Sequence, residues 1–172
     1  MCQLCDQPDL TTEEYDDQIR ALLDQHRFVL QAVGGSRSRA EFSYTVGLTA
    51  HGLPELVVTG LRVADASQLL RHWGNYLLDT SLVLPGETLE SGMWVMEAVE
   101  VEQPQEHLFT AIRIFGEQVR GLQLAWADAR GFWPWELGHR GRRAGQPLLG
   151  RRAAVFCDEH RPDRLDVPPS LP

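Results

Sequence analysis

Apolar residues recur at helical spacing near the start of the chain and predict a first helix. Four of them share one face: Tyr15, Ile19, Leu22 and Leu23. Thr11 and Glu14 have the spacing of a capping box, in which each side chain accepts a hydrogen bond from the other residue's backbone N–H. The pattern predicts a helix over residues 12–26 whose apolar face packs against the rest of the protein.

Two stretches of alternating apolar residues follow and predict a pair of adjacent antiparallel strands. Their apolar positions are Phe28, Leu30 and Ala32, then Phe42, Tyr44 and Val46. A Gly-Gly-Ser turn at residues 34–36 and an arginine-bearing loop separate the two stretches. A short apolar run at residues 56–58, ending at Gly60, predicts a third, buried strand.

The second half of the chain mixes helical and strand patterns without regular alternation. The predicted elements are a helix around residues 66–77, a loop around 85–86, a strand over 94–101, a helix over 106–116 and a strand over 122–126. A doubly wound sheet would need strict alternation, so this order favours an α+β domain. We expect a largely antiparallel mixed sheet packed by about three helices.

Length and composition fit one globular domain over residues 1–160, followed by a proline-rich tail at 161–172. The chain has 172 residues, of which 43% are hydrophobic, which is enough for a core without disulfides. It contains no apolar run of membrane-spanning length, and its N-terminus lacks a basic region followed by an apolar stretch. These features predict a cytoplasmic protein with no membrane partner.

The net charge of −8 argues against a nucleic-acid partner, because binding phosphates needs an excess of cations. All sixteen basic residues are arginines, and seven of them fall within residues 140–164. This group can be a solvated face or a patch for an anion or an acidic partner.

All three cysteines lie in ligand pairs near the termini. Cys2 and Cys5 form a Cys-x2-Cys pair, and Cys157 and His160 form a Cys-x2-His pair. Three sulfurs and one nitrogen make a closed structural Zn²⁺ site, which predicts a zinc clasp between the two ends. A redox pair of the first two cysteines, or no shared role, remains open. His26 is an alternative fourth ligand, although at a helix end it can equally complement the helix dipole.

The glycine-rich connection before the third strand is the first candidate for chemistry. Tyr44, Thr45, His51 and Glu55 surround it and could converge on a ligand. Its glycines and proline are also the ordinary residues of a tight turn. Pro54, between the histidine and the glutamate, argues against a metal pair on a helix.

A tryptophan-rich segment is the second candidate. Trp133 and Trp135 flank a proline, with Arg130, Glu136 and His139 close in sequence. Aromatic walls, an acid and a base could line one pocket there, or the indoles could simply cover the edge of the core.

Three segments together resemble the bacterial family called domain of unknown function 4262. They are F-S-Y-T-V-G-L-T-A-H-G-L-P-E-L-V-V-T-G-L at 42–61, W-A-D-A-R-G-F-W-P-W-E at 126–136 and Q-P-L-L-G at 146–150. The resemblance covers residues 15–150, and the M-C-x-x-C-D opening is similar to that of actinobacterial members. The family label implies no particular activity, and the C-D-E-H segment is not part of its pattern.

Two functions from different classes follow from these candidates. The first is a zinc-stabilised binding module that uses the 44–55 turn and the 133–139 loop to recognise a small molecule or a protein. The second is an enzyme in which His51 or His139 acts as general base, oriented by Glu55 or Glu136. No nucleophile elbow, P-loop, zincin or dinucleotide motif is present. The enzyme hypothesis requires the two segments to meet in one pocket.

Overall fold

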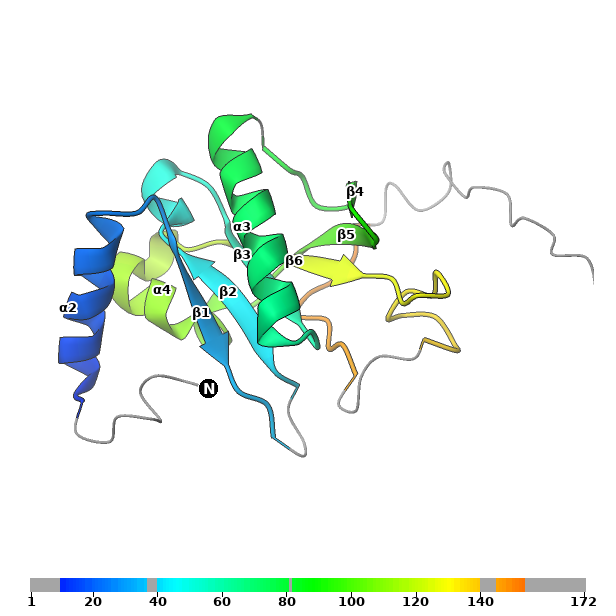
Figure 1. Cartoon of the computed structure of the whole chain (residues 1–172), viewed down its shortest axis with the longest axis horizontal. Coiled ribbons are helices and arrows are strands. Elements are labelled where there is room, and N and C mark those ends of the chain that lie inside the picture. Colours follow the sequence, from blue (N-terminus) through cyan, green and yellow to red (C-terminus); the bar gives the residue numbers. More distant parts are fainter. Residues whose placement is uncertain (1–9, 37–39, 81, 140–144, 154–172) are drawn as a thin grey trace, which may run out of the picture.

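A six-stranded mixed sheet forms the centre of the computed structural model, which describes residues 10–36, 40–80, 82–139 and 145–153. The strands are β1 (Val29–Val33), β2 (Phe42–Val46), β3 (Glu55–Thr59), β4 (Thr88–Ser91), β5 (Trp94–Glu100) and β6 (Gly121–Trp126). They lie in the order β1-β2-β3-β6-β5-β4 (Figure 1). All neighbours pair antiparallel except β3 and β6, which run parallel with Glu55 beside Gly121. The predicted α+β fold with a largely antiparallel mixed sheet is confirmed.

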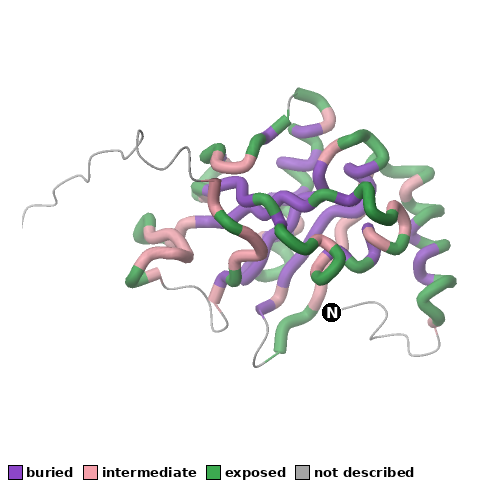
Figure 2. Tube along the Cα trace, turned by 180° about the vertical axis from the view of Figure 1, so that it is seen from behind, coloured by how far each residue is buried: buried purple, intermediate pink, exposed green. Residues whose placement is uncertain are grey.

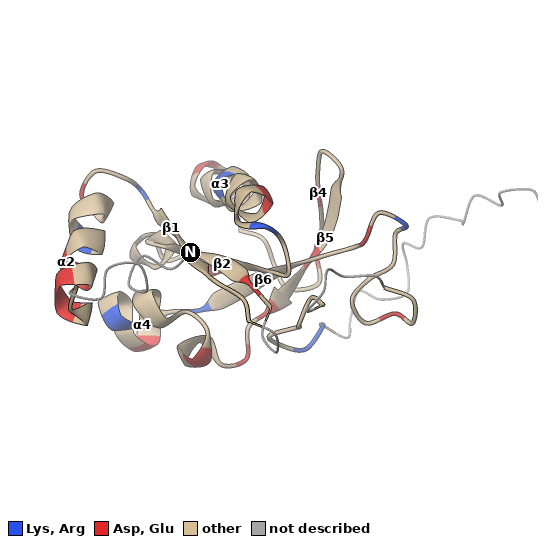
Figure 3. Ribbon diagram, turned by 60° about the horizontal axis from the view of Figure 1, so that its bottom comes forward, with Lys and Arg blue, Asp and Glu red and all other residues tan. Residues whose placement is uncertain are grey.

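Helices cover both faces of the sheet. The described residues form the α-helices α2 (Thr12–Leu23), α3 (Val63–Asp79) and α4 (Phe109–Phe115), and the 3₁₀ turns η1 (Leu48–His51), η2 (Pro104–Glu106) and η3 (Gly116–Gln118). The turned view in Figure 3 places α3 on one side of the sheet and α2 and α4 on the other. In the part of the chain that the structure describes, no helix is both long and apolar enough to cross a bilayer.

Helix α2 begins as predicted but packs through a different face. Thr11 and Glu14 form the capping box, with the Glu14 backbone N–H donating to the Thr11 hydroxyl oxygen over 3.2 Å. Tyr15 and Ile19 are each only 3% exposed, whereas Leu22 is 41% exposed. The expectation that Leu22 belongs to the packed face is therefore wrong. The buried residues Tyr15, Asp16 and Ile19 place the contact face toward Asp16, and Leu22 lies at the margin of this face.

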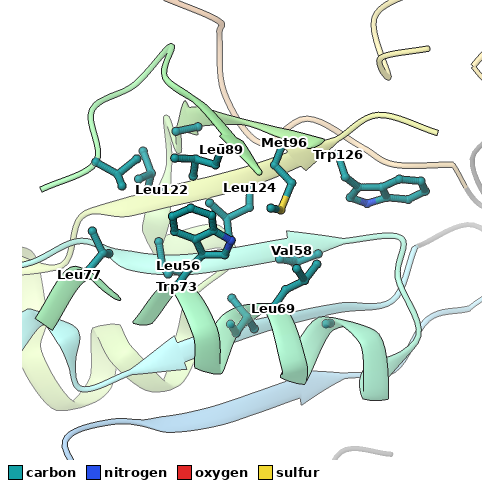
Figure 4. Packing of buried hydrophobic residues seen from close by; sticks show 14 of the residues in the cluster. Leu56, Val58, Leu69, Trp73, Leu77, Leu89, Met96, Leu122, Leu124 and Trp126 are labelled. Atoms are coloured by element: carbon teal, nitrogen blue, oxygen red, sulfur yellow. The ribbon is translucent and has the colours of Figure 1, made fainter. Parts of the chain in front are cut away.

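Each face of the sheet carries its own hydrophobic core. Beneath α3, the largest cluster includes Leu56, Val58, Leu69, Trp73, Leu77, Leu89, Met96, Leu122, Leu124 and Trp126 (Figure 4). Beneath α2 and α4, the second cluster contains Tyr15, Ile19, Phe42, Tyr44, Val46, Val57, Val101, Leu108, Ala111 and Val119. Figure 2 shows the buried residues concentrated along the strands between these layers.

Two elements differ from the sequence prediction. Strand β4 was not predicted, because its four residues include only one apolar side chain, the buried Leu89. The helix expected over 106–116 is divided: η2 ends at Glu106, and α4 starts at Phe109. In β4, which is an edge strand, one buried position gives an alternation too weak to detect from the sequence.

Residues 145–153 cross the α2/α4 side of the sheet, and we call this segment the strap. Its carbonyl at Pro147 accepts hydrogen bonds from the Thr59 hydroxyl at 3.0 Å and the Gln123 amide at 2.8 Å. A Cβ added at Gly150 would lie 1.7 Å from the Glu100 carbonyl oxygen, so only glycine permits this approach.

Candidate functional site

The glycine-rich connection before β3 is organised around the carboxylate of Glu55, which is fully buried. Its Oε1 accepts hydrogen bonds from Gly47 N at 2.9 Å, Thr49 N at 2.9 Å and Thr49 Oγ1 at 2.8 Å. Its Oε2 accepts from the Thr45 hydroxyl at 2.6 Å. That hydroxyl itself accepts from the backbone N–H of Leu56, so its own proton points at Glu55. The carboxylate thus holds η1 in place.

No cationic side chain among the described residues forms an ion pair with Glu55. Burial raises the pKa of this carboxyl, and the hydrogen bonds from Thr45, Thr49 and Gly47 act in the opposite direction. Desolvation disfavours the charged form, while donors aimed at the oxygens favour it. All these donors belong to the turn, so the geometry gives Glu55 a structural role in positioning η1.

Two other predicted residues of this turn are also used for structure. Tyr44 is 2% exposed, and its hydroxyl accepts a hydrogen bond from the backbone N–H of Thr110, at the start of α4. Thr45 is buried against Glu55. His51 ends η1 and is exposed, and in the described part of the chain it has no hydrogen bond to Glu55 or any other carboxylate. The turn therefore provides one accessible functional side chain, His51.

A cleft of about 640 Å³ opens beside His51, and we call it the α2–η1 cleft. Its lining comes from the end of α2 and the residues after it, from η1, and from the end of α4. The lining residues are Arg20, Leu23, Asp24, Gln25, His26, Arg27, Gly47, Ala50, His51, Ile114 and Phe115. A hydrogen bond from the Arg120 guanidinium to the Gly52 carbonyl, at 3.0 Å, fixes the far end of the turn. The volume falls in the range of small-molecule sites.

Hydrogen bonds within the tryptophan-rich loop close it on itself. The carboxylate of Asp128 accepts from the backbone N–H groups of Arg130 at 2.9 Å and Phe132 at 3.1 Å. The carboxylate of Glu136 accepts from Trp133 N at 2.9 Å. Arg130 donates to Asp128 and to the carbonyl of Gly138. The predicted acid Glu136 and the predicted ligand-binding residue Arg130 therefore shape the loop.

The two indoles of the loop stack on each other. Trp133 and Trp135 have centroids 5.1 Å apart and are nearly parallel. The guanidinium of Arg152, from the strap, lies 3.9 Å from the centroid of Trp135. Arg152 also forms two hydrogen bonds of 2.7 Å with Glu97 of β5. This stack joins the loop, the strap and the sheet.

His139, at the end of the loop, packs beside the sheet. Its ring lies 5.6 Å from that of Trp126, which in turn contacts Trp94 edge to face. Its Nε2 is buried and has no hydrogen-bond partner among the described residues. The predicted pairing of His139 with Glu136 as base and orienting acid is not formed: a backbone hydrogen bond from His139 N to Glu136 O, at 3.3 Å, is the contact between them.

The structure places the two candidate segments at opposite ends of the parallel pair β3 and β6 (Figure 1). Glu55 begins β3 beside Gly121, at the start of β6, whereas the tryptophan-rich loop follows Trp126 at its end. Five residue steps along a strand correspond to about 17 Å. The hypothesis that one pocket is lined by both segments is therefore wrong.

Sequence reasoning missed most residues of the α2–η1 cleft. Arg20, Leu23 and Arg27 surround the end of α2, and Ile114 and Phe115 belong to α4, some ninety residues later. His26 was the one residue at the end of the first helix that the sequence singled out, as an alternative metal ligand or a complement of the helix dipole. The position of α4 beside the end of α2 depends on tertiary packing, which the sequence pattern does not reveal.

The predicted metal ligands Cys2, Cys5, Cys157 and His160 lie outside the described residues. Within residues 10–36, 40–80, 82–139 and 145–153, no group of three or more His, Cys, Asp or Glu side chains is placed to hold a metal ion. His26, the alternative ligand, is described and lines the α2–η1 cleft.

Fold and site together define an α+β protein with a six-stranded mixed sheet and an open cleft at one end of its parallel pair. The chain belongs to the family Domain of unknown function (DUF4262), whose model matches residues 22–140. The matched span contains the whole sheet and η1. No curated protein and no solved structure matches the chain significantly.

Proposed function

We propose that this protein is a binding module that takes a small molecule in the α2–η1 cleft. The observation that carries the proposal is the convergence of three separate segments on one concavity with both apolar and polar walls. Leu23, Ile114 and Phe115 provide apolar surface, and His51 provides an exposed imidazole at the rim. An apolar pocket with a few convergent polar groups is the usual form of a ligand site.

The contacts of Glu55 also support this proposal. A ligand site works best when its walls are fixed before the ligand arrives. The Glu55 hydrogen bonds to Gly47 and Thr49 fix the turn that carries Ala50 and His51 into the cleft. The predicted enzyme would use Glu55 to orient His51, but the hydrogen bonds of Glu55 go to the turn instead. The enzyme hypothesis receives no such support from His51.

The proposal is tested by a thermal-shift screen of small molecules on the full chain. A hit should stabilise the parent protein, and the shift should fall in the Phe115→Ala and His51→Ala variants. His72→Ala is the matched control, since His72 is an exposed histidine on α3, outside the cleft lining. Shifts that are unchanged in both cleft variants would contradict the proposal.

We also propose that a structural Zn²⁺ joins the two ends of the chain through Cys2, Cys5, Cys157 and His160. Support comes from the sequence: every cysteine falls in a ligand pair with two intervening residues. A reducing cytoplasm would keep these thiolates available to the metal.

The Cys-x-x-Cys opening and the absence of lysine support an actinobacterial type of this family.

A further inference from the structure

We infer that the ligand of the α2–η1 cleft is an organic anion, with a carboxylate or phosphate group attached to an apolar body. This inference rests on the proposed function and specifies its ligand class. Three observations carry it. Cationic side chains line the cleft, their present ion pairs are exposed to solvent, and other residues of the lining are apolar.

The lining of the cleft contains more cationic than acidic side chains. Two arginines, Arg20 and Arg27, and two histidines, His26 and His51, line it with a single acid, Asp24. The whole chain carries a formal charge of −8. The acidic ion-pair partners of the two arginines offset this excess in the structure. An anion that displaces those partners would meet two guanidinium groups and a single lining acid.

Both arginines can turn toward a ligand, because their present partners are solvent-exposed. Arg20 pairs with Asp17 at 3.0 Å, with the two side chains 50% and 69% exposed. Arg27 pairs with Asp79 at 2.6 Å, with exposures of 47% and 60%. Exposed ion pairs of this kind contribute little to stability. An incoming carboxylate or phosphate can accept from the same guanidinium groups, because the planar fork of N–H donors matches the oxygens of both anions.

The apolar lining gives the other half of the ligand. Leu23 is half-buried at the end of α2, and Ile114 and Phe115 are half-buried at the end of α4. These residues also pack on the second core, so their side chains are anchored. A small inorganic anion would leave this surface uncovered. An organic anion would bury it while its charged group met the basic side chains.

The experiment uses two fluorescent probes with the same ring system. One is 1-anilinonaphthalene-8-sulfonate, which is anionic, and the other is N-phenyl-1-naphthylamine, which is neutral. The anionic probe should bind the full chain more tightly. Arg20→Gln and Arg27→Gln should each lower the affinity for the anionic probe by about two- to fivefold, which corresponds to one exposed charge contact. Neither substitution should change the affinity for the neutral probe. Octanoate and phenyl phosphate should displace it, which tests the two anion types separately.

Two control variants separate failure of the inference from failure of the proposed function. Arg62→Gln removes an arginine with an i,i+3 partner, Asp65, at 3.0 Å, which matches the pair of Arg20 but lies outside the cleft lining. It should change the affinity for neither probe. Phe115→Ala should lower the affinity for both. Equal binding of the two probes, with no effect of Arg20→Gln or Arg27→Gln, would overturn the anion assignment alone. No effect of Phe115→Ala on either probe would overturn the cleft as a binding site.

Discussion

Thr49 donates two hydrogen bonds to the same oxygen of Glu55, one from its backbone N–H at 2.9 Å and one from its hydroxyl at 2.8 Å. Gly47 N donates a third to that oxygen. One buried carboxylate therefore fixes the turn that borders the α2–η1 cleft. Its removal would act on the fold and on the cleft together.

Replacing Glu55 with Ala should destabilise the protein by more than about 3 kcal/mol. Four donors, from Thr45, Gly47 and Thr49, would lose their acceptor. An unsatisfied buried donor costs about 1 to 3 kcal/mol. Urea unfolding followed by tryptophan fluorescence measures the change. A loss below 1 kcal/mol would mean that water replaces the carboxylate and that the turn does not depend on it.

The protonation of Glu55 should make stability depend on pH in a defined direction. Burial raises the pKa of its carboxyl above the ordinary value of 4.5. The folded state then holds the proton more tightly than the unfolded state, so stability falls as the pH rises from 4.5 through the raised pKa. Glu55→Gln cannot titrate and is the reference. The free energy of unfolding of the parent, minus that of this variant, should decrease across this interval; an increase would show that the hydrogen bonds outweigh burial.

Arg152 should matter more for stability than its neighbour Arg151. Arg152 and Glu97 have side chains only 30% and 8% exposed, whereas Arg151 and its partner Glu102 are 90% and 54% exposed. Arg152→Gln should therefore cost about 1.5 to 3 kcal/mol, and Arg151→Gln less than about 1 kcal/mol. Denaturant unfolding of both variants provides the comparison. Similar decreases in the free energy of unfolding of the two variants would refute a special role for the Arg152 stack.

Helix α2 offers a test of its contact face. Ile19→Ala should cost about 2 to 5 kcal/mol, because the Ile19 side chain is buried in the core beneath α2 and α4. Leu22→Ala should cost less than about 1 kcal/mol, since 41% of Leu22 is exposed. Chemical denaturation measures both. A larger loss for Leu22 would reverse the assigned orientation of the helix.

The proposed zinc clasp predicts one Zn²⁺ per chain in native mass spectrometry. Chelation, or the Cys2→Ser and Cys157→Ser substitutions, should lower the melting temperature without unfolding the domain, because the described residues have two cores of their own. Metal-free protein from a reducing purification, with the same melting temperature in both variants, would exclude the clasp.

Much of the fold could be predicted because its elements have strong periodic patterns. The alternation through Phe42 and Tyr44 and the apolar run at Leu56 correspond to β2 and β3, and the capping box of Thr11 was visible directly. The sequence could not show that β3 and β6 run parallel, since this pairing depends on packing between residues 66 positions apart. That parallel pair separates the two candidate segments.

The candidate site was less predictable, because residue type does not reveal what a side chain contacts. Glu55 and Glu136 both suggested acid–base chemistry, yet each accepts backbone hydrogen bonds within its own turn. His51 was identified, and its cleft was not. Its lining includes Leu23 and Phe115, two ordinary apolar residues at helix ends.

The strap has a practical consequence for where this fold can be cut. The family match ends at residue 140, but Gln123, Thr59 and Trp126 find hydrogen-bond partners in residues 146–149. A chain shortened to the matched region would leave a row of amide, hydroxyl and backbone groups without those partners on the sheet. Homologues chosen for expression should therefore retain the segment equivalent to residues 145–153. The boundary of sequence similarity is not the boundary of the folding unit.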